Sequence, residues 1–257
     1  MATRDTAWPA GTPCWVDLTV KDFDEAAKFY ASLFGWSVSP GGPETGGYAV
    51  ATKEGRPVAG LAPQMDPNQP LPGWITSLAT DDVDDTTRKI HDAGGSVVVE
   101  PMDVLDLGRF AIASDPAGAV FGLWQARKHI GFTLYNVPGA PCWNENLGTE
   151  WELNKAFYKA LFDYSYGDLS TDEFKYATID LNGRPVGGIG QVSTGPSMWK
   201  AYFHSANTDV TVGQVKELGG TVVTPPQDSP YGRMATVTDS QGHTFSVIQD
   251  PQDNPQS

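Results

Sequence analysis

Two short segments place an acidic side chain close to a tryptophan, and these residues are the best suited to chemistry in the chain. The first segment contains Trp15 and Asp17, and the second contains Trp143 and Glu145. Alternate residues of a strand point to the same face, so each tryptophan is expected to share a face with its carboxylate. An enclosed carboxylate can have a raised pKa and act as a general base, although pairing with a nearby donor is commoner.

The two segments belong to an internal repeat. The spacing between copies is 128 residues at first (142 − 14), and it falls to 125 and then to 124 further along the chain. Two small length changes are typical of loops in a duplicated domain. We therefore expect two domains, over residues 10–126 and 138–250. The matching pairs are Cys14-Trp15 with Cys142-Trp143, Phe29-Tyr30 with Phe157-Tyr158, Gly55-Arg56-Pro57-Val58 with Gly183-Arg184-Pro185-Val186, Trp74 with Trp199, Gly108-Arg109 with Gly232-Arg233, and Gln125 with Gln249.

Each half also contains one order of elements twice. Residues 15–20 alternate like a half-buried strand, and Asp22 with Glu25 forms a capping box before a helix that Gly35 ends. Three strands follow, and the same order begins again at Trp74. The sequence thus predicts an α+β fold of four β-α-β-β-β units. The further elements expected in the first half are strands at 36–39, 46–52, 57–62, 75–80, 96–99, 110–114 and 119–125, and a helix at 82–93.

Composition limits the classes of partner. The formal net charge is −14, and nucleic acids and anionic membranes both require a basic surface. No apolar run is long enough to span a membrane, and the first residues do not resemble a signal peptide. Cys14 and Cys142 are repeat-equivalent, so a disulfide between them is not expected. We expect a cytoplasmic monomer or homodimer that binds neither nucleic acid nor membrane.

The unit order, the Phe-Tyr pair in the first helix, and the Asp115-Pro116-Ala117-Gly118 turn resemble one superfamily. This is the vicinal oxygen chelate superfamily, which includes glyoxalase, bleomycin-resistance proteins and extradiol dioxygenases. The chain is similar to its tandem-domain, glyoxalase-like branch in actinobacteria, whose members are often described as hydroxylases or as accessory proteins of antibiotic pathways. The resemblance implies two tandem domains with cup-shaped mixed sheets. Whether each cup forms within one half or by exchange of units between halves stays open.

The resemblance also implies where a metal would be bound. Enzymes of the superfamily use His, Glu or Gln side chains seven residues before a helix-capping Asp and seven residues after the turn Asp. Indole, alkyl and glycine side chains cannot ligate a metal, and a charged lysine is a poor ligand. We therefore expect no metal and no other cofactor. The residues at these positions are Trp15, Ile75 and Gly122 in the first half, and Trp143, Lys200 and Ser246 in the second.

Strand parity then predicts which side chains line the two cups. The candidates for acid–base chemistry are Asp17 in the first cup, and Glu145 with His204 in the second. His91, His129 and His243 are expected in solvent. Aromatic walls with a few polar groups suit a planar, hydrophobic ligand, although Trp15 and Trp143 can equally fill the cups as core residues. The predicted ligand-binding residues are Trp15, Ile75, Ser77, Gly122 and Trp124 in the first cup, and Trp143, Lys200, Tyr202 and Ser246 in the second.

Three functions remain open from the sequence. The first is metal-independent binding of a hydrophobic or aromatic small molecule, for sequestration, delivery or an accessory role in secondary metabolism. The second is a cofactorless hydroxylase, oxygenase or isomerase that acts on such a ligand through Glu145, His204 and Asp17. The third is a regulatory protein whose cups are filled by its own side chains. The two halves share aromatic walls but no complete catalytic set, which favours binding.

Overall fold

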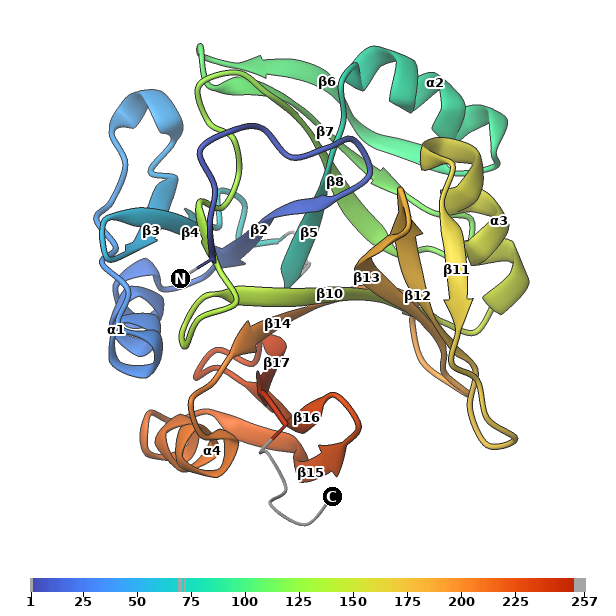
Figure 1. The fold of residues 1–257 in the computed structure, drawn as a ribbon. Coiled ribbons are helices and arrows are strands. Elements are labelled where there is room, and N and C mark those ends of the chain that lie inside the picture. The colour runs from blue at the N-terminus through green and yellow to red at the C-terminus, as the bar shows by residue number, and fades with distance from the viewer. Residues whose placement is uncertain (1, 69–70, 72, 252–257) are drawn as a thin grey trace.

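The chain forms two large mixed sheets with helices packed around them, as the computed structural model shows for residues 2–68, 71 and 73–251 (Figure 1). The fold is α+β, as predicted. The first half contains β2 (Pro13–Val20), α1 (Phe23–Phe34), the 3-10 helix η1 (Pro43–Thr45), β3 (Ala49–Lys53), β4 (Arg56–Pro63), β5 (Trp74–Ala79), α2 (Val83–Asp92), β6 (Ser96–Val104), β7 (Gly108–Ser114) and β8 (Val120–Ala126). The second half contains β10 (Pro141–Gly148), α3 (Trp151–Phe162), β11 (Ser165–Asp168), β12 (Tyr176–Leu181), β13 (Arg184–Gln191), β14 (Met198–His204), α4 (Thr208–Glu217), β15 (Thr221–Ser229), β16 (Gly232–Thr238) and β17 (Thr244–Gln249).

Each large sheet takes its strands from one half of the chain. The order is β3-β4-β2-β5-β8-β7-β6 in the first sheet and β11-β12-β13-β10-β14-β17-β16-β15 in the second. Trp15 pairs with Ser77, and Ser77 with Gly122, so predicted lining residues from three strands are neighbours. In the second sheet, Trp143 pairs with Tyr202 in the same way. The two cups therefore form within the halves.

The helices, in contrast, pack across the two halves. Helix α1 lies beside α4, and α2 lies beside α3 (Figure 1). Phe34 of α1 packs against Phe203 and Phe245 of the second half, at ring-centroid distances of 5.0 and 5.8 Å. Phe157 of α3 packs 6.1 Å from Phe121 of the first half. Both hydrophobic cores thus contain residues of both halves, and we keep the division at 10–126 and 138–250 as a proposal.

Two buried Asp–Tyr hydrogen bonds connect the halves at equivalent places. Tyr158 of α3 donates to Asp115 of the first half over 3.0 Å, and Tyr30 of α1 donates to Asp239 of the second half over 2.9 Å. Each aspartate begins a turn and accepts backbone N–H groups of that turn, so the turn holds the carboxylate in place. Asp239 also contacts His243 Nδ1 at 2.8 Å. His243 is only 6% exposed, so its expected place in solvent was wrong.

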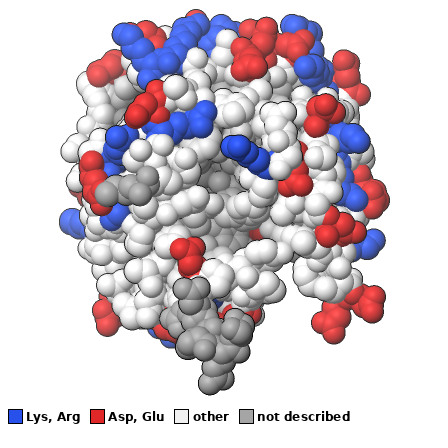
Figure 2. All heavy atoms as spheres, viewed as in Figure 1, with Lys and Arg blue, Asp and Glu red and all other residues white. Residues whose placement is uncertain are grey.

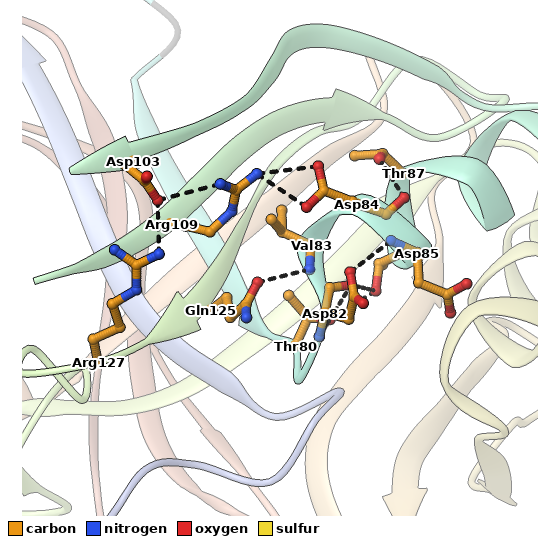
Figure 3. Close-up of polar contacts among 11 residues, drawn as sticks. Thr80, Asp82, Val83, Asp84, Asp85, Thr87, Asp103, Arg109, Gln125 and Arg127 are labelled. Atoms are coloured by element: carbon orange, nitrogen blue, oxygen red, sulfur yellow. Dashed lines mark hydrogen bonds and ion pairs between the residues drawn. The ribbon is translucent and has the colours of Figure 1, made fainter. Parts of the chain in front are cut away.

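The repeated Arg and Gln residues fix the start of the second helix in each half. Arg109 of β7 reaches both carboxylate oxygens of Asp84 and also bonds Asp103, as Figure 3 shows. The Gln125 side chain of β8 accepts the N–H of Val83, the first residue of α2. The equivalent residues of the second half make the same contacts at the start of α4. Arg233 binds Asp209, and the Gln249 side chain accepts the N–H of Thr208. These repeated residues therefore position helices and not a ligand.

Local signals were accurate at helix ends and less so in the connections. Asp22 accepts the N–H of Glu25, and Gly35 ends α1 at φ +71°, as predicted. The strand expected at 36–39 is reduced to a single bridge between Ser37 and Thr52. The linker between the two halves, expected from the sequence at residues 126–140, contains an unexpected short strand, β9 (Leu134–Tyr135), paired with β1 (Ala2–Thr3). Among the described helices, none has the length and apolar character needed to cross a bilayer.

Candidate functional site

Each cup contains a tryptophan, a tyrosine and a carboxylate joined by hydrogen bonds. In the first, Tyr48 donates to Asp17 Oδ1 over 2.6 Å, and Trp15 Nε1 lies 2.8 Å from the Tyr48 hydroxyl and 3.0 Å from Asp17 Oδ1. In the second, Trp143 Nε1 donates to the Tyr176 hydroxyl over 3.1 Å, and Tyr176 donates to Glu145 Oε2 over 3.0 Å. The two sets are repeat-equivalent.

Tyr48 and Tyr176 were missed by the sequence reasoning, although their spacing of 128 residues (176 − 48) marks them as copies. Both reach their carboxylate by crossing a glycine of the neighbouring strand, Gly60 or Gly188. A Cβ at either glycine would lie 2.0 Å from the tyrosine hydroxyl oxygen. These two glycines, also 128 residues apart, are therefore required for the tyrosine to lie across the sheet.

Asp17 is held in surroundings that favour its protonated form. Burial raises its pKa from an ordinary value of 3.8 to about 6, against the opposing effect of the Tyr48 and Trp15 hydrogen bonds. The folded state therefore binds this proton more tightly than the unfolded state, so stability falls as the pH rises from 3.8 to 6. A pKa shift of this size lowers the free energy of unfolding by about 3 kcal/mol at pH values above 6.

We expect Asp17→Asn to raise the free energy of unfolding by about 1–3 kcal/mol at pH 8, with a gain that shrinks toward pH 4. The amide keeps an acceptor oxygen for Tyr48 and Trp15 but removes the buried charge. Urea unfolding at several pH values measures the effect, and Asp172→Asn, at an exposed position, is the control. A loss of stability at pH 8 would show that the hydrogen bonds of the carboxylate outweigh the cost of burying it.

The first cup is largely filled by the linker. Trp15 is only 3% exposed, because the His129 ring lies edge-on against it at a centroid distance of 4.5 Å. The His129 carbonyl accepts the Trp124 N–H, which holds the linker in place. Burial lowers the pKa of His129 to about 4, so this ring is neutral at pH 7. The expectation that His129 lies in solvent was wrong, because the linker folds back over the sheet.

The other predicted residues of the first cup are packed together. Ser77 is buried beneath Gly122, where an added Cβ would lie 2.1 Å from the Ser77 hydroxyl oxygen. Ile75 and Trp124 are half-buried. The structure therefore brings Trp15, Ser77, Gly122 and Trp124 together, but as a packed wall with little open surface.

The second cup is more open and richer in polar groups. Trp143, Tyr176 and Lys200 are half-buried, while Glu145 is 6% exposed and accepts a second hydrogen bond, from Tyr202, over 2.5 Å. Burial raises the pKa of Glu145, although Tyr202, Lys200 and Tyr176 each act in the opposite direction. Burial and the nearby Glu145 charge also raise the pKa of Tyr202, so its hydroxyl stays a donor at neutral pH.

Lys200 and Ser246 complete the wall around Glu145. Lys200 Nζ lies 3.4 Å from Thr236 Oγ1 and 5.7 Å from the Tyr202 ring centroid. Ser246, 1% exposed, shares a 3.0 Å hydrogen bond with the same threonine. A space-filling view shows a hollow near the middle of one face of the molecule, and most of the atoms visible around it are uncharged (Figure 2).

His204 does not join this cluster. It lies at the end of β14, where its Nε2 is 3.3 Å from Asp250, and it lines a separate cavity beside α1 and α4. The structure shows no contact between His204 and Glu145 among its described residues. The predicted Glu145–His204 acid–base pair is therefore not formed, and the groups that face Glu145 are the hydroxyls of Tyr176 and Tyr202.

A pair of cup-shaped sheets, each built from two β-α-β-β-β units, defines a tandem vicinal oxygen chelate architecture. Residues 13–123 match the model of the Glyoxalase/Bleomycin resistance protein/Dioxygenase superfamily. The chain is 39% identical over 249 residues to "Putative glyoxylase CFP32" of Mycobacterium tuberculosis (strain CDC 1551 / Oshkosh), covering 93% of this chain and 94% of that one. It is 33% identical over 261 residues to "Anthracycline biosynthesis protein DauV" of Streptomyces sp. (strain C5), covering 95% of both.

The protein belongs to this glyoxalase, bleomycin-resistance and dioxygenase superfamily. Its fold is also similar to that of a Mn(II)-bound glyoxalase from Novosphingobium aromaticivorans, with a TM-score of 0.68 and 18% identity over 95% of this chain and 83% of that one. A second similar structure is 2,2',3-trihydroxybiphenyl 1,2-dioxygenase from Sphingomonas wittichii strain RW1, with a TM-score of 0.65 and 14% identity over 95% and 91% of the two chains.

The residues of this chain do not fit the metal that the family implies. At the family's ligand positions stand Trp15, Ile75 and Gly122, then Trp143, Lys200 and Ser246, and the two indoles donate their N–H groups to tyrosine hydroxyls. Among the described residues, no group of three or more His, Cys, Asp or Glu side chains is placed to hold an ion.

Proposed function

We propose that the second cup binds a planar hydrophobic or aromatic small molecule without a metal held by the protein. One observation carries the proposal: Trp143 and Tyr176 present half-buried aromatic surface next to a buried carboxylate that two tyrosine hydroxyls hold in place. A rigid ring surface with a few fixed polar groups is the usual composition of a small-molecule site. Lys200 adds a cation beside it, which suits a ligand that carries a phenol or quinone oxygen.

The relatives support a role in secondary metabolism. Two of them are named anthracycline biosynthesis proteins, and both are similar to this chain over almost its whole length. We infer that this protein sequesters or delivers a polycyclic aromatic compound, or assists an enzyme that modifies one. Its free cysteines, Cys14 and Cys142, suit the reducing cytoplasm, and its net charge of −14 does not suit nucleic acid or an anionic membrane as partner.

Titration with planar phenols and quinones, followed by calorimetry and by tryptophan fluorescence, tests the proposal. We expect one ligand per chain, because the first cup is filled by His129. Trp143→Ala should weaken binding by about tenfold or more, since it removes both the ring surface and the N–H donor. Trp143→Phe, which keeps a ring, should weaken it less.

Removal of metal is the matching control. Binding should be the same before and after treatment with a chelator. A divalent ion bound to the protein at about one per half, together with loss of ligand binding on chelation, would contradict the metal-independent proposal. If none of the planar compounds binds, the remaining candidate is a regulatory protein whose cups are filled by its own side chains. The packed first cup is an example of such a filled cup.

A second function, cofactorless catalysis on such a ligand, is favoured by Glu145 alone. Burial raises the pKa of this carboxyl, as required of a general base that works near neutral pH. Tyr202 and Tyr176 each donate their one hydroxyl hydrogen to Glu145, so their part in this proposal is to hold the carboxylate in place. His204 has no part in this proposal.

A further inference from the structure

A second cavity lies where the two halves meet, away from both cups. It has a volume of about 250 Å³ and lies between the end of α1, the linker, the end of β14 and the start of α4. Apolar side chains form much of its wall, among them Leu33, Phe34 and Val210. The charged or protonatable side chains on the wall are Lys53 and His204, and the described lining includes no Asp or Glu. This basic character is notable in a chain with a net charge of −14.

Lys53 has hydrogen-bonding capacity that the protein does not use. Its ammonium donates to the carbonyl oxygen of Phe34 over 2.8 Å, which caps the end of α1. An ammonium has three N–H donors. No carboxylate of the described residues lies within ion-pair distance of this half-buried group. An anion in the cavity would supply the missing counter-charge.

His204 also has an unused polar atom. Its side chain is 13% exposed, with Nε2 at 3.3 Å from the exposed carboxylate of Asp250. Its Nδ1 is buried without a hydrogen-bond partner among the described residues. Buried polar atoms of side chains usually have a partner, and His204 is one of the residues that line the cavity, so its unpaired Nδ1 leaves a place for a ligand or a water.

The repeat provides an internal comparison. Residue 53 corresponds to Leu181 at a spacing of 128, and residue 204 corresponds to Ala79 at a spacing of 125. The backbone around the two positions is conserved between the halves. Gly139 donates its N–H to the carbonyl of His204, as Gly11 does to that of Ala79. The same backbone arrangement therefore forms with leucine and alanine at these positions, so the fold does not require Lys53 and His204.

We infer that this cavity binds a small organic acid with an apolar body. The carboxylate pairs with Lys53 and His204, and the apolar body packs against Leu33, Phe34 and Val210. Phosphate alone would leave the apolar wall uncovered, and a neutral hydrocarbon would leave the lysine unpaired. The site is separate from the second cup and does not depend on the function proposed there.

Calorimetric titration of the full-length protein with phenylacetate and with its neutral analogue phenylacetamide tests the inference. We expect one phenylacetate per chain and binding of the amide at least about tenfold weaker, because the amide loses a charge-assisted hydrogen bond. Lys53→Leu and His204→Ala, which copy the other half, should each weaken phenylacetate by about tenfold. Lys53→Arg should retain most of the affinity. Lys28→Leu, on the exposed face of α1, is the control for loss of one positive charge.

Several results would overturn the inference. These are equal binding of the acid and the amide, no binding of the acid at millimolar concentration, or an equal loss of affinity in Lys28→Leu and Lys53→Leu. If Lys53→Leu does not fold, the wild-type comparison of acid with amide and the His204→Ala variant still decide the question. Unchanged phenylacetate affinity in the presence of a saturating cup ligand would support two separate sites, and direct competition would contradict them.

Discussion

Asp239→Ala is expected to lower the free energy of unfolding by about 3–5 kcal/mol at pH 7, the largest effect of any single change considered for this protein. The carboxylate is 2% exposed and contacts Tyr30 of the other half, His243 Nδ1 and two backbone N–H groups of its own turn. Alanine leaves all of these groups without an acceptor in a buried site. Urea unfolding monitored by circular dichroism measures the change.

The pH dependence of this loss has a definite sign. Burial by itself would raise the pKa of Asp239, but the hydrogen bond and charge of His243, with further bonds from the backbone and Tyr30, hold it below its ordinary value. A depressed pKa contributes stability above the unfolded value of about 4, and this contribution is lost as the pH falls below it. The difference between Asp239→Ala and the wild type should therefore shrink in acid.

Ser240→Ala, in the same turn, is the matched control, with an expected change below about 0.5 kcal/mol. A loss that is equally small in Asp239→Ala would mean that the contact between the halves rests on the aromatic packing of α1 alone. Asp115 offers a second comparison, because burial raises its pKa and none of its partners among the described residues is a histidine. Asp115→Asn should therefore be tolerated better than Asp239→Asn.

Glu145→Gln is expected to lower any turnover by about 10²–10⁴-fold while it changes ligand affinity by less than about tenfold. Glutamine has the shape of glutamate and can still accept from Tyr202, but it cannot take a proton. In the wild-type protein, turnover should rise with pH as Glu145 loses its proton, above the ordinary range of a carboxyl because its pKa is raised. Single-turnover rates and calorimetric affinities, measured on the same protein, separate the two effects.

Glu152→Gln is the control for this change, since Glu152 is exposed on α3. Tyr202→Phe should weaken turnover as well, because it removes the short hydrogen bond to Glu145 Oε1. Turnover that survives Glu145→Gln would exclude Glu145 as the base and leave ligand binding as the function of the second cup.

Much of the fold could be predicted because its signals are local or repeated. Strand alternation placed Trp15 beside Asp17 and Trp143 beside Glu145, and the structure shows each pair on one face. The N-cap at Asp22 and the stop at Gly35 are likewise properties of a few neighbouring residues. The other half of the expected capping box is replaced by a distant residue, because the Asp22 N–H donates to Gln241 Oε1. The α+β class follows from these signals together with the duplication, and the superfamily was predicted from the resemblance of the unit order, the Phe-Tyr pair and the Asp115 turn to known members.

His91 is exposed on α2 as predicted, but the other three histidines could not be placed in this way. His129 lies in a linker whose path depends on contacts with the sheet it covers, and His243 is buried by a turn that meets a helix of the other half. Strand parity placed His204 on the same face of β14 as Lys200 and Tyr202, but this residue lies beyond the cup, beside Asp250. Tyr48 and Tyr176 were detectable from their spacing, yet their role depends on glycines in a neighbouring strand.

The packing of helices across the two halves determines how this protein unfolds. Each sheet belongs to one half, but residues of the other half help to cover α1 and α3. Separation of the two halves would expose apolar surface on the first helix of each half. It would also break the two Asp–Tyr hydrogen bonds between the halves. We therefore expect the two halves to unfold as one cooperative unit, in a single transition, although the sequence is a duplication.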